Sequence, residues 1–421
     1  MKHLVVTECF NSLLISDTGN QECLTSLEAD ELAAYVIKHD LEEDGIQFSR
    51  NEITFINYVG FIQLRSCSIE ILPKVSGNDV RHSRQVLLRM LQRSGFLNIH
   101  ESQVSQLMIE KMNLFEIIAS LFTEKLALEL RKGVFKTYQR EYGELHLVRG
   151  KINMNRQLLR EAMMQPGVSC IYDEFQIDNP LNQAFRAALQ IVMSQSKFPS
   201  TKKRAMSSEV LLDEVDSRLF NYDQLDRIRF DRTNVRFQDS FQLAKLLVGR
   251  SAPVFSPGRN KNSSILFKMN DLFEAYIAYL VRKNWDEVTV KDRSYKLLVN
   301  ERNSRGVFQL EPDLLVARPN GKQIIIDTKW KMIHSQRPRH GVKREDFYQM
   351  YAYLTRYKKV TEVVLLYPHH DGIASCDSCL ESWHLEGESG KKIKVYSIQY
   401  ENEQVAESEL RDIVGSLELL D

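Results

Sequence analysis

Apolar residues recur at the three- and four-residue spacing of an amphipathic helix in several long stretches of the chain. This spacing predicts helices in the segments LEADELAAYVIKH, RQVLLRMLQRSGF, NLFEIIASLFTEKLALELRKG, NPLNQAFRAALQIVMSQ and SFQLAKLLVG. In the first segment it places Leu27, Leu32, Tyr35 and Val36 on one side of the helix. Gly133 suits the C-cap of the third. Two other apolar segments, ITFINYVGFIQL and CSIEILPKV, have the composition of strands, and Pro73 closes the second.

The pattern changes after residue 264. The preceding stretch, GRSAPVFSPGRNKNSS at 249–264, is rich in Gly, Pro, Ser and Asn and is typical of a linker or domain boundary. A helix over MNDLFEAYIAYLVRKNW follows it, then several strands, a helix over REDFYQMYAYLTRYK and a strand over EVVLLYP. This alternation predicts a compact α/β unit.

Chain length limits how these elements group. At 421 residues the chain should hold two or three domains, because single cores rarely grow past about 250 residues. We predict a multidomain protein that combines α+β and α/β parts. Its divisions are a β-rich N-terminal domain over 1–105, a mainly helical middle region over 106–255 and an α/β domain over 256–421.

Charge and composition narrow the possible partners and locations. Lys and Arg together number 56 and so do Asp and Glu, so that any contact with nucleic acid must come from local basic patches. The first residues lack the features of a signal peptide, and no apolar run approaches the roughly 20 residues that span a bilayer. We therefore expect a cytoplasmic protein without a membrane partner.

The six cysteines imply no disulfide framework. Cys376 and Cys379 form one CxxC, but a zinc site needs two further ligands and His384 is the only nearby candidate. A surface loop with free thiols is the favoured interpretation. A metal site at His369, His370 and Asp371 is also disfavoured, because their spacing does not suit one strand face.

Two aspartates and a lysine gather where two strands of the tail begin and end. In IIIDTKW, side-chain alternation places Asp327 and Lys329 on one face and turns Thr328 away. The preceding strand offers Asp313, and the connecting ARPNG favours a tight hairpin that brings both aspartates within reach of one cation. Such carboxylates suit Mg²⁺, and the lysine can orient or deprotonate a water for phosphodiester hydrolysis. Alone, this pattern also arises by chance from charged strand ends.

Two nearby helices add polar side chains. Glu274 lies at the border of the apolar stripe of its helix, which fits either a half-solvated position or one turned towards a site. Gln349 and Tyr353 are four residues apart and share a helix face. Each of these features, taken singly, also fits ordinary surface or partly buried packing.

The order of these signals is informative. A helix with Glu, a strand with Pro-Asp, a strand with Asp-x-Lys and a helix with Gln-x-x-x-Tyr resemble the RecB-like variant of the PD-(D/E)xK restriction-endonuclease-like fold. Nearly the whole chain resembles the McrC family, the nuclease subunits of McrBC-type restriction systems that act on modified (5-methylcytosine) DNA. The sequence segments that carry this resemblance are YVGFIQL, IEILPKV, LRKGVFKTYQREYGELHLVRGKI, CIYDEFQIDNPLNQAFRAAL, FEAYI, PDLLV, IIIDTKW, DFYQMYAYL and LLYPH.

The resemblance implies an endodeoxyribonuclease that depends on Mg²⁺ or Mn²⁺. Its implied catalytic residues are Asp313, Asp327, Lys329, Glu274, Gln349 and Tyr353, of which Asp313, Asp327 and Glu274 are the implied metal ligands. It also implies a separate AAA+ GTPase partner, similar to McrB, that the chain stimulates and contacts through its N-terminal and middle regions. The chain has no GxxxxGK[ST] of its own, which agrees with a separate partner.

Two basic stretches are candidates for DNA contact. HSQRPRHGVKRE follows the catalytic strand, and its position favours contact of Arg337, Arg339, Lys343 and Arg344 with the DNA backbone, with Lys331 as an additional contact. Residues 131–160 carry eight Lys or Arg against two Glu, interleaved with aromatic residues. This second stretch fits a phosphate-tracking surface, a partner interface or a solvated edge.

Two alternatives to the restriction nuclease stay open. The chain could be a non-catalytic adaptor that stimulates an AAA+ NTPase, or a stand-alone DNA repair nuclease. The intact Asp313, Asp327 and Lys329 argue against the adaptor, because clustered carboxylates repel one another without a cation.

Overall fold

The computed structural model describes most of the chain. The described residues are 2–9, 11–17, 22–39, 41, 45–76, 79–98, 110–216, 225–248, 264–318, 321–334, 336–373 and 379–415. They form two compact units. Unit 1 contains Met1–Gly60, Ser66–Val104 and Leu266–Asp421, and unit 2 contains Phe61–Arg65 and Ser105–Ile265. The N-terminal segment therefore packs with the tail in unit 1, while the predicted linker, up to residue 263, lies outside the described residues.

The N-terminal segment is β-rich, as predicted. Its elements are β1 (Lys2–Thr7), β2 (Ser12–Leu14), α1 (Ser26–Lys38), β3 (Ile46–Phe48), β4 (Glu52–Phe55), β5 (Tyr58–Gln63), β6 (Cys67–Leu72) and α2 (Val80–Arg93). One sheet has the order β1-β6-β5-β10, with β1 parallel to β6, and a smaller one has the order β2-β4-β3.

Two expectations for this segment are wrong in detail. ITFINYVGFIQL forms two strands, because the chain bends at Asn57, whose side chain accepts a hydrogen bond from the Asn270 amide at 3.0 Å. Leu27 is 82% exposed, because it lies about 140° around the helix from Leu32 and therefore outside the buried stripe of α1.

Unit 2 contains the predicted helices and an unpredicted sheet. Its elements are α4 (Leu114–Arg131), β7 (Thr137–Leu145), β8 (Lys151–Ile152), α5 (Met154–Ala162), β9 (Val168–Gln176), α6 (Pro180–Gln195), α7 (Pro199–Val210), η4 (Val235–Phe237) and α9 (Gln238–Val248). Gly133 follows α4 with a φ of 114°, as its predicted capping role requires. Besides these helices, the middle region contains an antiparallel sheet of β7, β9 and β8.

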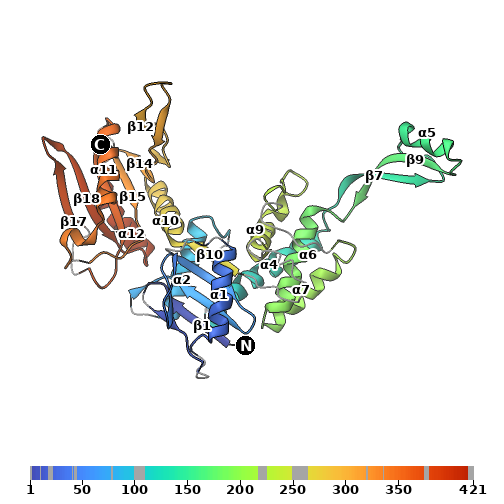
Figure 1. Cartoon of the computed structure of the whole chain (residues 1–421), viewed down its shortest axis with the longest axis horizontal. Coiled ribbons are helices and arrows are strands. Elements are labelled where there is room, and N and C mark those ends of the chain that lie inside the picture. The colour runs from blue at the N-terminus through green and yellow to red at the C-terminus, as the bar shows by residue number, and fades with distance from the viewer. Residues whose placement is uncertain are drawn as a thin grey trace. The chain divides into compact units, whose positions relative to one another are not determined.

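The tail is an α/β structure, as predicted (Figure 1). Its elements are β10 (Ser264–Lys268), α10 (Met269–Asn284), β11 (Val288–Val290), β12 (Lys296–Val299), β13 (Gly306–Gln309), β14 (Leu314–Ala317), β15 (Gln323–Thr328), η5 (Pro338–Gly341), α11 (Arg344–Arg356), β16 (Val360–Pro368), β17 (Cys379–Leu385), β18 (Glu388–Ile398) and α12 (Glu403–Val414). Six strands form a mixed sheet in the order β11-β14-β15-β16-β18-β17, and β12 pairs with β13 in a separate hairpin.

The centre of the mixed sheet positions the candidate site. β14 and β15 form the predicted antiparallel hairpin, while β15 runs parallel to β16 and β16 parallel to β18. Met350, Tyr353 and Leu354 of α11 pack in one buried cluster with Ile325 of β15. Because side chains alternate along a strand, Asp327 shares the face of Ile325, towards α11.

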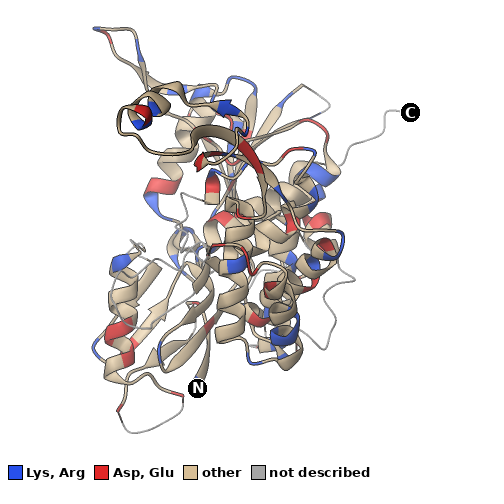
Figure 2. Ribbon diagram, turned by 90° about the vertical axis from the view of Figure 1, so that its right-hand side faces the viewer, with Lys and Arg blue, Asp and Glu red and all other residues tan. Residues whose placement is uncertain are grey.

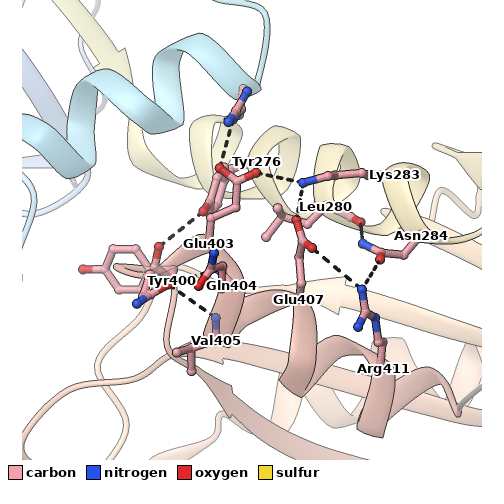
Figure 3. Close-up of polar contacts among 12 residues, drawn as sticks. Tyr276, Leu280, Lys283, Asn284, Tyr400, Glu403, Gln404, Val405, Glu407 and Arg411 are labelled. Carbon is pink, nitrogen blue, oxygen red and sulfur yellow. Dashed lines mark hydrogen bonds and ion pairs between the residues drawn. The ribbon is translucent and has the colours of Figure 1, made fainter. Parts of the chain in front are cut away.

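The helix α10 is fixed against α12 by polar contacts. Lys283 pairs with Glu403 at 3.2 Å and Glu407 at 2.6 Å, and Arg411 bonds Asn284 at 3.0 Å (Figure 3). Among the described residues, no helix combines the length and apolar character needed to cross a membrane.

Candidate active site

Asp313 and Asp327 lie at the same end of the β14–β15 hairpin. Leu314 pairs with Ile326, and continuing that register by one residue places the two aspartates opposite each other. Residues directly opposite on paired strands point to the same face. Asp313 Oδ2 accepts hydrogen bonds from the Thr328 amide and from its hydroxyl, both at 2.7 Å. Thr328 was expected to point away from the site, so its contact with Asp313 corrects that expectation.

Asp327 is buried beside a lysine. Its side chain is 1% exposed, and Oδ2 forms an ion pair with Lys329 Nζ. Burial and then the negative charge of Asp313 raise the pKa of Asp327, Lys329 opposes both effects, and the net result is a pKa of about 7. For Lys329, burial alone would lower the pKa, but the charge of Asp327 raises it overall. The two aspartates are therefore close enough for the charge of Asp313 to disfavour the charged form of Asp327.

Helix α11 supplies the groups that hold Lys329. Lys329 Nζ donates a hydrogen bond to Gln349 Oε1 at 3.2 Å, and Gln349 Nε2 donates to the Tyr353 hydroxyl at 2.9 Å. Tyr353 is buried, and its pKa is raised by burial and then by the charge of Asp327. The sequence placed both side chains on one helix face, and the structure brings that face to Lys329.

Glu274 approaches from α10 and is coupled to Asp313. Burial raises the pKa of Glu274, and the charge of Asp313 raises it further. Glu274 also pairs with Lys291 at 3.0 Å, and the Lys291 amide donates to the Asp313 carbonyl at 3.0 Å. Sequence reasoning missed Lys291. Its position just after β11, at a strand end like Asp327, is the only signal that could have identified it.

The negative charges of Asp313 and Asp327 are the reason that this site suits a divalent cation. Within the described ranges, no group of three or more His, Cys, Asp and Glu side chains is arranged as a metal cluster. The lysine ammonium groups of Lys329 and Lys291 instead pair with Asp327 and Glu274. Both hydrogen bonds from Thr328 go to Oδ2 of Asp313, so Oδ1 takes no part in that contact. Two neighbouring carboxylates, of which Asp313 disfavours the charged form of Asp327, suit a hard cation.

The predicted DNA-contacting residues fall into two groups. Lys331 Nζ bonds both carboxylate oxygens of the buried Asp346, at 3.0 and 3.1 Å, so its charge is compensated within the protein. The other four are exposed around η5 and the start of α11, namely Arg337, Arg339, Lys343 and Arg344. Arg339 and His340 have positive φ angles of 53° and 54°, which turn the chain sharply here. DNA contact by all five stays a prediction.

The histidines after β16 have structural partners. His370 Nε2 donates to the Ile333 carbonyl at 2.7 Å, and Nδ1 accepts from the Gly372 amide at 3.0 Å. Burial lowers the pKa of His370, which agrees with a neutral ring. These bonds favour the predicted loop over a metal site. Cys376 lies outside the described residues, and Cys379 begins β17.

The basic stretch at 131–160 is largely charge-compensated. Arg160 and Arg156 both pair with Glu144, the latter at 3.6 Å, and Arg149 pairs with Glu174 at 3.3 Å. Figure 2 shows Lys and Arg interspersed with Asp and Glu along the ribbon. The local excess that favoured a phosphate-tracking surface is therefore reduced.

Comparison with known proteins places the chain in a family. The model for the McrBC 5-methylcytosine restriction system component matches residues 53–368, about three quarters of the 421 residues. The chain belongs to the McrBC family. No curated protein sequence matches this McrBC family member significantly.

Two solved structures of Thermococcus gammatolerans share the fold of this McrBC family member. The first is a refined half-complex from a tetradecameric assembly of McrB AAA+ hexamers with bound McrC. The matched chain has a TM-score of 0.71 and 20% identity, over 98% of this chain and 100% of that chain. The second is the cryo-EM structure of the McrBC complex, with a TM-score of 0.52 and 22% identity, over 67% and 88% of the two chains.

Proposed function

We propose that the chain is the nuclease subunit of an McrBC-type restriction system. It cleaves DNA phosphodiester bonds with a PD-(D/E)xK site in its tail, in a Mg²⁺-dependent reaction. The observation that carries this proposal is the juxtaposition of Asp313, Asp327 and Lys329 at the end of the β14–β15 hairpin. A buried carboxylate with a pKa of about 7 is costly to the fold, and an adaptor without catalysis has no use for it.

Asp313 and Asp327 would hold the cation, with Glu274 as a third, outer carboxylate. A divalent cation bound there would stabilise charge on the phosphate and lower the pKa of a water. Lys329 Nζ orients the attacking water and stabilises the negative charge that develops on the phosphate. Gln349 holds the ammonium in that position through its 3.2 Å hydrogen bond.

Replacing Gln349 by Met is expected to slow cleavage about 10- to 100-fold, the range found for residues that orient metal-site groups. The substitution removes the acceptor for Lys329 and the donor to Tyr353. Tyr353→Phe is expected to have a smaller effect, because Gln349 keeps its bond to Lys329. Single-turnover cleavage rates measure both effects, and equal rates for Gln349→Met and wild type would contradict this role of Gln349.

The exposed arginines around η5 are proposed to contact DNA phosphates. Replacing Arg337 and Arg339 together by Ala is expected to reduce the slope of log affinity against log salt by about 2, since each phosphate contact contributes about 0.9. The matched control replaces Arg356 and Lys358, exposed at the opposite end of α11, and should leave the slope unchanged. Equal slopes for both double variants would exclude the proposed contact.

We also propose that the chain works with an AAA+ GTPase partner similar to McrB. The first Thermococcus structure contains McrB AAA+ hexamers with bound McrC, and its matched chain is covered completely by this one. The sheet of unit 2 supports a partner interface, because it and α5 expose many large apolar side chains. These are Tyr138, Tyr142, Leu147, Val148, Ile152, Met154, Leu158, Leu159, Met163, Met164 and Phe175.

One assay tests the proposed function. Methylated and unmodified plasmids are incubated with the chain, with an McrB-like AAA+ protein of the same organism, and with Mg²⁺ and GTP or ATP. The proposal expects cleavage of methylated DNA only when the chain, partner, nucleotide and Mg²⁺ are all present. Cleavage by the chain alone would identify a stand-alone nuclease, whereas stimulated NTP hydrolysis without any cleavage would identify an adaptor.

A further inference from the structure

Trp330 connects the end of the catalytic strand to the N-terminal segment, within unit 1. It follows Lys329 directly, and its ring packs against Phe273 of α10, whereas Lys329 reaches Gln349 of α11. The ring is 5% exposed, and Nε1 donates a 2.6 Å hydrogen bond to Glu8 Oε1. Glu8 is fully buried just after β1, 322 residues away in the sequence.

A buried lysine completes this contact. Lys74, in the segment after β6, is 1% exposed, and its Nζ lies 5.1 Å from the centre of the Trp330 ring. Glu8 Oε2 and Lys74 Nζ are both buried and have no hydrogen-bond partner within the described residues. Burial raises the pKa of Glu8 to about 8 and lowers the pKa of Lys74. Apolar residues would usually stabilise such a position at least as well, so the polar pair needs a reason other than stability.

An aromatic cluster joins Trp330 to helix α10. The Trp330 ring lies 5.2 Å from Phe273 and 5.2 Å from Tyr400, between ring centres. The Tyr400 hydroxyl donates a hydrogen bond to the Lys74 carbonyl. The Tyr400 carbonyl accepts one from the Tyr276 hydroxyl at 3.4 Å (Figure 3). The cluster therefore ties α10 to the N-terminal segment.

The aromatic cluster contains direct sequence neighbours of two candidate active-site residues, one on α10 and one at the end of β15. Phe273 precedes Glu274, and Trp330 follows Lys329. A shift of Trp330 would move the end of β15 relative to α10, and so Asp327 and Lys329 relative to Glu274. A misplacement of about 1 Å can cost about a hundredfold in rate.

We propose that Trp330 is a positioning residue, held by Glu8 and Lys74, that sets the catalytic end of β15 against α10. The N-terminal segment thereby takes part in assembling the active site. This inference rests on the proposed nuclease function, and it assigns a role to buried groups that the reaction itself does not use.

The test uses Trp330→Phe, which keeps an aromatic ring and removes the N–H that Glu8 accepts. In the full complex, cleavage should fall about 10- to 100-fold, as for other groups that orient a metal site. The affinity of the isolated chain for Mn²⁺, measured by calorimetry, should fall in parallel. The variant should still stimulate the NTP hydrolysis of the AAA+ partner to the wild-type level. A purely structural role would not weaken Mn²⁺ binding while sparing that stimulation.

A pair of Glu8 variants provides a rescue test. Glu8→Gln keeps an oxygen acceptor for Trp330 Nε1 and should retain most of the cleavage and Mn²⁺ affinity. Glu8→Leu removes that acceptor and should reproduce the defect of Trp330→Phe. Equal cleavage rates and equal Mn²⁺ affinities of the two Glu8 variants would overturn the proposal. This comparison remains decisive even if Trp330→Phe does not fold.

Trp285→Phe is the matched control. Trp285 is 6% exposed and ends α10, about 16 Å along the helix from Glu274. It should lose stability without losing Mn²⁺ affinity or cleavage. Wild-type values for Trp330→Phe, or the same loss in both tryptophan variants, would overturn the positioning role alone. A wild-type chain that neither bound Mn²⁺ nor supported cleavage would instead overturn the proposed function, and this inference with it.

Discussion

Replacing Asp327 by Asn is expected to reduce DNA cleavage by the assembled complex at least about a thousandfold. The substitution keeps the size of the side chain but removes the negative charge that would bind the cation and that pairs with Lys329. Folding, partner binding and stimulation of NTP hydrolysis should persist, because Asp327 lies at a strand end in the tail. Lys329→Met and Asp313→Asn should have the same phenotype.

Glu362→Gln is the matched control for this experiment. Glu362 is a half-buried carboxylate on β16, pairs with Arg318 at 2.8 Å and Lys394 at 3.2 Å, and lies opposite Ile324. Asp327 lies three positions beyond Ile324 along β15, or about 10 Å. Glu362→Gln should lose stability but cleave at the wild-type rate. Wild-type cleavage by Asp327→Asn would contradict the assignment of the site.

In the absence of divalent cations, the free energy of unfolding of Asp327→Asn is expected to rise with pH relative to that of the wild type. The pKa of Asp327 is about 7 in the folded chain and near 3.8 in the unfolded chain. Between these values the folded state holds a proton that the unfolded state has lost, so the wild-type free energy of unfolding falls as pH rises. Asn does not titrate. The difference between the two proteins should therefore grow by up to about 4 kcal/mol between pH 4 and pH 7.

Denaturant unfolding at several pH values measures this difference in the free energy of unfolding. The titrations of Glu8 and Glu274 cancel in the difference, because both proteins contain these residues. Saturating Mg²⁺ should reduce the pH dependence, since a bound cation favours the ionised carboxylate. A difference that stays constant from pH 4 to pH 7 would show that Asp327 titrates normally and is not held in a strained, buried state.

The sequence predicted the elements that bear the site, because their patterns are local. Helices α10 and α11 have clear apolar stripes, and the ARPNG turn between two short apolar runs predicted the β14–β15 hairpin. The four-residue spacing of Gln349 and Tyr353 likewise placed both on one face. Periodicity failed for Thr328, because its hydroxyl and amide turn to Asp313 where β15 ends and alternation no longer constrains the chain.

Other features depend on contacts that no local pattern contains. Strand β7 has side chains that alternate between half-buried and exposed, with few apolar residues on either face, so its pairing with β9 is not signalled by the sequence of β7. Lys291 and Glu274 meet across separate elements. The bond between Glu8 and Trp330 joins residues 322 positions apart in the sequence and can be found only in the folded structure.

The most direct test of the central claim is anomalous diffraction from crystals of the wild-type chain soaked in Mn²⁺. The account predicts a peak with carboxylate oxygens of both Asp313 and Asp327 at about 2.0–2.3 Å, and no peak in crystals of Asp327→Asn. A wild-type map without a peak between these two carboxylates, at a Mn²⁺ concentration that supports cleavage, would contradict it.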